Sequence, residues 1–135
     1  MIYALLLSAA ATLIGLGTSP LVDSQHNHEW TPVTNQAEGE TVLHDRNWSA
    51  TMEQDGRTLN LILMRVDMID SGDKIVMDTI IAADCANSEV GLKEAYFFQS
   101  PFGNGIRMPI DYVEMDLAAE PLGNDDAAIL DAACN

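Results

Sequence analysis

Two cysteines, Cys85 and Cys134, are the most reactive side chains in this sequence, and the second lies one residue from its end. Thiols can act as nucleophiles, bind zinc or form a disulfide. A zinc site needs four ligands, and the three histidines lie far from both cysteines in sequence. The N-terminal sequence indicates export, and two cysteines in a small exported domain predict one disulfide. We therefore predict an architectural Cys85–Cys134 bridge and no catalytic thiol.

Three histidines offer other chemistry. His26 and His28 stand two residues apart, and with a nearby N-terminal amine such imidazoles can bind copper, nickel or zinc. Nothing fixes a further ligand beside them, so we favour a flexible polar leader and predict neither metal nor cofactor. His44 lies beside Asp45 on a short predicted strand. Its spacing pairs it with no serine or thiol nucleophile, so we interpret it as a structural or surface histidine.

Three acids at every third position, Asp67, Asp70 and Asp73, suggest calcium binding by composition. The calcium-binding loop places its ligands at alternate positions and closes with a glutamate, which is missing here. Turn formation explains the sequence Asp-Ser-Gly-Asp adequately, and we favour it over calcium binding. We find no paired nucleophile and base, no metal-ligand set and no cofactor loop, and we predict that the protein is not an enzyme.

Residues 1–24 are typical of an export signal, because they are apolar up to Val22, with cleavage predicted near Ser24. No lysine or arginine precedes the apolar run, so an uncleaved N-terminal anchor is the alternative. In both cases one domain, residues 25–135, reaches the periplasm, the cell surface or the medium. No second apolar run is long enough to span a bilayer, so no membrane span is expected after the signal.

The chain is acidic, with 21 Asp and Glu against 6 Lys and Arg and a formal net charge of −15. This charge repels nucleic acid and anionic lipid surfaces, so neither is an expected partner. The acids are scattered and form no block, which favours solubility over cation binding as their role. The remaining partner classes are an unidentified protein and a second copy of the chain.

Short strands joined by turns and followed by one helix form the predicted domain. A short strand at HEWTPV is confined to a sheet edge by Pro32, and a second strand covers TVLHD. Asp55-Gly56 predicts a tight hairpin, and IDSGDK predicts another turn. Turns of a few residues favour an antiparallel sheet, here of about five or six strands.

Alternation along the longer predicted strands assigns side chains to faces. In LNLILMRVDM, Leu59, Leu61 and Leu63 share one face and other apolar residues share the second. This strand is therefore either covered on both sides or offers one face to a partner. In GLKEAYFFQS, Tyr96 and Phe98 share a face and are either core residues or partly exposed. We take these five residues together as the candidate surface for a dimer or ligand.

The sequence DDAAILDAAC predicts a C-terminal helix with Asn124 as its N-cap. Ala127, Leu130 and Cys134 recur at helical spacing, and Ile129 and Ala133 widen this apolar stripe. A helix this short must dock on another element to be stable. Alternation in KIVMDTIIAADC directs Cys85 inward at the end of a strand. The predicted fold is thus α+β, an antiparallel sheet with a C-terminal helix packed on one face and tethered by the disulfide.

Several short segments resemble one known family. EWTPV, HDRNWS before a hairpin, a strand ending in DC and a terminal helix ending in AAC are similar to the surface-adhesin protein E family of small exported bacterial proteins. The resemblance extends over residues 29–135. Its fixed points are Trp30, Val33, Asp45, Ser49, Asp84, Cys85 and Cys134.

This resemblance implies an antiparallel sheet with a disulfide-tethered helix. It also implies a relationship to a lipid-anchored surface protein that binds host matrix proteins and dimerises, although this chain has no cysteine in its signal region. We therefore expect an exported, non-catalytic binding protein of the bacterial envelope or secreted fraction. The alternatives are an acidic structural periplasmic protein without a specific ligand, and a small hydrolase whose carboxylates form no recognisable motif.

Overall fold

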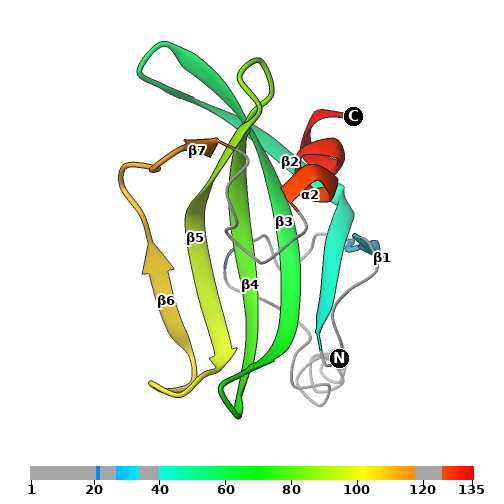
Figure 1. The fold of residues 1–135 in the computed structure, drawn as a ribbon, viewed down its shortest axis with the longest axis vertical. Coiled ribbons are helices and arrows are strands. Elements are labelled where there is room, and N and C mark those ends of the chain that lie inside the picture. Colours follow the sequence, from blue (N-terminus) through cyan, green and yellow to red (C-terminus); the bar gives the residue numbers. More distant parts are fainter. Residues whose placement is uncertain (1–20, 22–26, 34–39, 118–125) are drawn as a thin grey trace, which may run out of the picture.

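The fold is one antiparallel sheet with a helix on one face (Figure 1). The computed structural model describes residues 21, 27–33, 40–117 and 126–135. In this part of the chain the strands follow the order β1-β2-β3-β4-β5-β6, with β7 paired to β5, so the α+β prediction is confirmed. The elements are β1 (Trp30–Pro32), β2 (Thr41–Gln54), β3 (Arg57–Asp70), β4 (Asp73–Asp84), β5 (Glu89–Gln99), β6 (Ile106–Pro109), β7 (Asp116–Leu117) and α2 (Asp126–Cys134).

Two tight turns set the register of the three central strands. Asp55 and Gly56 have φ of 54° and 76°, and Ser71 and Gly72 have φ of 53° and 87°. Two consecutive residues of positive φ match the right-handed twist of a hairpin. The turns join β2 to β3 and β3 to β4, as the sequence predicts. The edge position of β1 also agrees with the prediction from Pro32.

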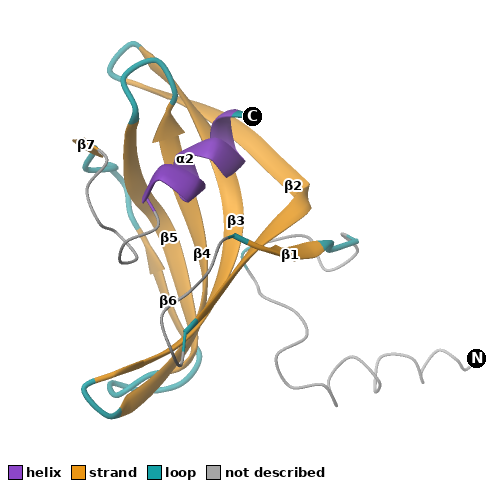
Figure 2. Ribbon diagram, turned by 45° about the vertical axis from the view of Figure 1, so that its right-hand side comes forward, coloured by secondary structure: helices purple, strands orange, loops and turns teal. Residues whose placement is uncertain are grey.

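Strand β2 is longer than predicted. The predicted strand stops at Asp45, whereas β2 continues to Gln54 through a bulge. His44 pairs with Met64 and Ser49 with Ile62, so residues 45–48 stand opposite a single β3 residue. Extra residues on one strand bend it sharply, and Figure 2 shows the bend in β2. The bulge breaks the alternation on which the sequence prediction depends.

Strand β3 is covered on both faces. One buried cluster includes Val42, Ile62, Met64, Val66, Ile81 and Ile129 of α2. The cluster on the opposite face contains Leu59, Leu61, Leu63, Ile80, Ala82 and Val113, with Trp30 and Trp48 packed against it. Leu59 and Leu63 are fully buried and Leu61 is 9% exposed. These three leucines therefore pack in the core, which agrees with the alternative that this strand is covered on both sides.

Helix α2 lies on the concave side of the curved sheet (Figure 2). Ile129 is its fully buried anchor, and Leu130, Ala132 and Ala133 also pack on the core. Ala127, predicted on the apolar stripe, is exposed, whereas Leu130 and Cys134 of the same stripe pack on the core as predicted. The predicted N-cap, Asn124, lies outside the described residues.

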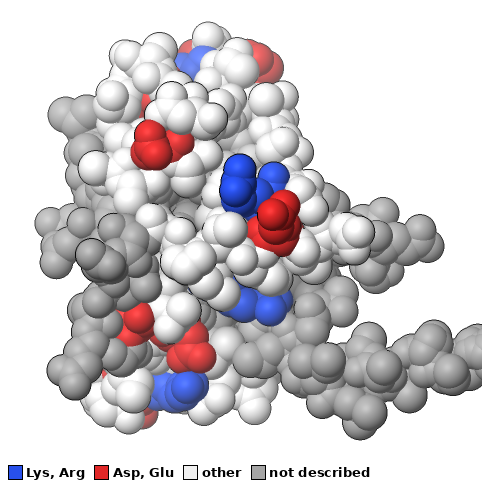
Figure 3. Space-filling view, turned by 90° about the vertical axis from the view of Figure 1, so that its right-hand side faces the viewer, with Lys and Arg blue, Asp and Glu red and all other residues white. Residues whose placement is uncertain are grey.

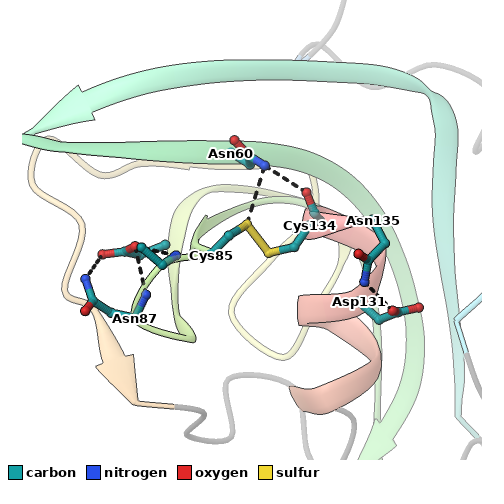
Figure 4. The surroundings of a disulfide bond; sticks show 9 residues. Asn60, Cys85, Asn87, Asp131, Cys134 and Asn135 are labelled. Atoms are coloured by element: carbon teal, nitrogen blue, oxygen red, sulfur yellow. Dashed lines mark hydrogen bonds between the residues drawn. A yellow bond between two sulfur atoms is a disulfide. The ribbon is translucent and has the colours of Figure 1, made fainter.

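The disulfide joins Cys85 to Cys134, as predicted (Figure 4). Cys85 is exposed in the turn that follows β4, so the bridge closes the end of the sheet and does not point inward as expected. Asn60 of β3 supports it from the side. Its Nδ2 donates to the carbonyl of Ala133 at 3.0 Å and to Sγ of Cys85 at 3.5 Å.

Asp84 holds the turn that carries Cys85. Its carboxylate accepts hydrogen bonds from the backbone N–H of Ala86 and Asn87 and from Nδ2 of Asn87. These bonds, led by the Asn87 side chain, together with Arg57, outweigh burial and hold the pKa of Asp84 below its ordinary value. The Asp84 carboxylate therefore stabilises the turn that carries Cys85.

Candidate functional site

A groove of about 830 Å³ lies between α2 and the bent part of β2, and we call it the α2–β2 groove. The bulge in β2 turns that strand away from the sheet, and the disulfide holds α2 opposite it. The lining mixes polar and apolar side chains. It includes His44, Arg46, Ser49, Thr51, Asn60, Asp131 and Asn135, together with Pro32, Val33, Trp48, Leu61 and Ile62.

Most basic side chains are engaged within the fold. Ion pairs join Arg57 to Asp84 and Glu89, Arg65 to Asp78, Lys74 to Asp67, and Arg107 to Glu94, and Lys93 donates to the carbonyl of Ile110. Figure 3 shows basic atoms beside acidic ones on a largely uncharged face. Among the described residues Arg46 makes no ion pair, and it is exposed at the groove. The groove thus presents an uncommitted guanidinium on an acidic protein.

His44 lines the same groove and is half-buried. Burial lowers the pKa of its imidazole, Arg46 lowers it further, and Asp45 opposes both. The ring is therefore neutral at neutral pH and can both donate and accept a hydrogen bond. Within the described part of the chain it is hydrogen-bonded to neither Ser49 nor Asp131.

Asp45 is a buried carboxylate that hydrogen-bonds to His28 and Glu29, the two residues directly before β1. It accepts from Nδ1 of His28 at 2.5 Å and from the backbone N–H of Glu29 and Asn47, each at 2.9 Å. Burial alone raises a carboxyl pKa, but these hydrogen bonds outweigh it, and the pKa of Asp45 is lowered. No local sequence signal predicted this role for Asp45.

The same contacts correct the expectation for His28. Its ring stacks on Trp30 with centroids 5.3 Å apart, and its Nδ1 is bound to Asp45. His28 therefore belongs to the fold and not to a flexible leader, while His26 lies outside the described residues. In the described ranges no three His, Cys, Asp or Glu side chains gather as a metal site would require.

On the face of the sheet opposite α2, Arg65 and Asp78 form a buried ion pair that the sequence patterns did not predict. Arg65 donates from Nε and Nη2 to the two carboxylate oxygens of Asp78, at 2.7 and 3.0 Å. Its guanidinium also lies 4.5 Å from the ring centroid of Trp30 and 5.3 Å from that of Phe98. Tyr96 packs edge-on against Phe98, and both rings are half-buried. These two aromatic residues of the candidate surface therefore pack around a structural ion pair.

The chain was compared with family models, curated proteins and solved structures. None of the three comparisons gives a match. Within the described residues no helix has the length and apolar character needed to cross a membrane.

Proposed function

We propose that this chain is an exported, non-catalytic binding protein of the bacterial envelope or secreted fraction, similar to surface-adhesin protein E, and that the α2–β2 groove receives a protein partner. The observation that carries the proposal is the uncommitted guanidinium of Arg46 in a groove of mixed lining. Arginine and tryptophan dominate the energetics of protein interfaces, and Arg46 and Trp48 line the same groove.

The chemistry of the groove defines what the partner presents. A guanidinium binds a carboxylate through two parallel hydrogen bonds, in a bidentate geometry. We therefore expect an acidic side chain or a C-terminal carboxylate opposite Arg46. Pro32, Val33 and Trp48 offer apolar contact beside it. The net charge of −15 repels a uniformly acidic protein. The partner therefore carries its carboxylate on an otherwise neutral or basic surface.

Export is supported by the disulfide, because such bonds persist in oxidising compartments and are rare in the cytosol. The resemblance to surface-adhesin protein E agrees in its helix tethered to an antiparallel sheet. A shared fold does not by itself assign a shared ligand. The binding proposal therefore depends on the groove and not on the resemblance.

Two variants of one strand test the groove. Thr51 and Thr41 are both exposed on β2, but only Thr51 lines the groove. Thr51→Trp fills the groove with a bulky side chain, and Thr41→Trp is its matched control. The mature, disulfide-bonded protein is immobilised, and partners are captured from the native envelope and secreted fractions.

We expect wild type and Thr41→Trp to capture the same protein, and Thr51→Trp to lose it. Arg46→Gln is expected to weaken capture without blocking the groove. Equal capture by all variants, or no protein retained above bare resin, contradicts the proposal. The latter result favours the structural alternative. A hydrolytic activity lost in His44→Ala favours the enzyme alternative.

A further inference from the structure

A second cavity opens on the concave side of the sheet, away from the α2–β2 groove. It encloses about 380 Å³, within the size range of small-molecule sites. Strands β3, β4 and β5 supply its walls through Met68, Ile75, Met77, Leu92 and Phe97, and none of the described side chains of α2 lines it. We call it the apolar pocket.

One polar atom in this pocket lacks a partner. Thr79 lines it between Met77 and Ile81 on the same face of β4, and its side chain is 1% exposed. In the described part of the chain its Oγ1 is the buried side-chain polar atom without a hydrogen bond. A buried hydroxyl normally finds a partner, because it has lost its water. The unpaired hydroxyl in an apolar pocket indicates a ligand that supplies the missing hydrogen bond.

The pocket is accessible from outside. Phe102 and Met108 line it and remain 60% and 40% exposed. Phe102 lies edge-on to Phe97, with ring centroids 5.0 Å apart. Exposed aromatic and thioether side chains beside a cavity provide adaptable apolar contact for an entering molecule.

Charge restricts the ligand class. Glu40 is the one charged side chain among the described residues that line the pocket, and the whole chain is strongly acidic. A carboxylate at the pocket, with no basic side chain among the described lining residues, disfavours an anionic ligand. A fully apolar ligand leaves the Thr79 hydroxyl unpaired.

From this geometry we infer that the apolar pocket binds a small, uncharged and mainly apolar molecule that carries one hydrogen-bonding group, and that this group meets Oγ1 of Thr79. This site is distinct from the protein-binding groove and does not depend on it. Its occupant is a neutral small molecule, not a polypeptide.

Three related dyes test the ligand class by fluorescence titration and displacement. N-phenyl-naphthylamine is neutral and has one N–H, benzylnaphthalene has a methylene in place of that N–H, and anilinonaphthalene sulfonate adds a negative charge. We expect saturable one-to-one binding of the amine to the mature, disulfide-bonded protein. We also expect at least tenfold weaker binding of the sulfonate. Absence of saturable amine binding, or equal affinity for the sulfonate, overturns the inference.

Thr79→Val tests the hydrogen bond with little change of shape. The variant should weaken binding of the amine by roughly 2- to 10-fold, the range of one neutral hydrogen bond, and leave benzylnaphthalene within about 2-fold. The same change for both ligands overturns the assignment of Thr79.

Phe102→Asp tests the pocket mouth, with Ile69→Asp as the matched control. Ile69 is also 60% exposed but does not line the pocket. Phe102→Asp should weaken the binding of both neutral ligands, while Ile69→Asp should leave their affinities unchanged. Equal effects of the two variants would place the dye outside the pocket and overturn the inference. Thr51→Trp in the α2–β2 groove should leave dye binding intact, so this inference and the proposed function fail separately.

Discussion

Removing the disulfide by the double change Cys85→Ser and Cys134→Ser should strongly destabilise the fold. The bridge connects the turn after β4 to the last residue of α2. Without it the helix keeps its buried anchor, Ile129, and the Asn60 hydrogen bond to the carbonyl of Ala133. The sheet keeps its strand pairing. The variant should therefore fold, with a smaller free energy of unfolding.

The size of the loss follows from the separation of the cysteines. They lie 49 residues apart, and for a closed loop of this length the chain-entropy model gives about 4 kcal/mol. Domains of this size have total stabilities of about 5–15 kcal/mol, so the bridge accounts for a large share. The helix has 9 residues and is too short to persist alone, so local opening of α2 should become more frequent.

Urea unfolding of the oxidised wild type and of the double variant measures this loss. The midpoint of the variant should fall, and its slope should equal or exceed that of wild type, because the unfolded chain without the bridge is less compact and exposes at least as much surface. Wild type measured with reductant is the control and should approach the variant. Amide exchange in residues 127–134 should also accelerate. An unchanged midpoint together with unchanged exchange would refute the view that the bridge holds α2 on the sheet.

Three further measurements address other parts of the account. Asp45→Asn should lower stability at neutral pH, because the folded-state pKa of the Asp45 carboxyl is depressed. The stability difference between wild type and variant should be complete above the unfolded pKa of about 4 and should disappear as pH falls through the lower folded pKa. A difference in urea midpoint that does not change with pH would contradict this. Thr79→Val should raise the melting temperature of the unliganded protein, since it removes an unsatisfied hydroxyl that costs about 1–3 kcal/mol, and calorimetry showing a lower value would argue against an unpaired Oγ1. The exported protein should begin near Gln25 by intact mass, whereas a chain retaining Met1 would favour the anchor.

Local sequence signals predicted the parts of the fold governed by local chemistry. Asp55-Gly56 and Ser71-Gly72 adopt the positive φ values that their types allow, and they set both central hairpins. Period-two alternation correctly separated the two faces of β3. The pairing of the cysteines followed from their number and the expected compartment. None of these predictions needed knowledge of distant contacts.

The candidate site depends on contacts that alternation cannot reveal. The β2 bulge places four residues opposite one and shapes the groove, but its residues carry no distinctive turn signal. The Asp45 interactions with His28 and Glu29 join residues that are 17 and 16 positions apart, respectively. The unpaired hydroxyl of Thr79 could not be predicted from the sequence, because it depends on how the neighbouring residues pack.

One missed feature had a usable signal. A two-residue turn at Ser71-Gly72 places Arg65 directly opposite Asp78, because both lie equally far from the turn. Each is a charged residue on a predominantly apolar strand face. A cross-strand ion pair could therefore have been predicted from the hairpin register. Its burial and its contacts with Trp30 and Phe98 required the structure.

Site-specific photo-crosslinking in the native cell tests the central claim, that the α2–β2 groove is a protein-binding site. A photoreactive amino acid is placed at Thr51 within the groove or at Thr41 on the same strand outside it. We predict a discrete adduct of higher mass after irradiation of the protein labelled at position 51, and none from position 41. No adduct from position 51, or the same adduct from both positions, would contradict the claim.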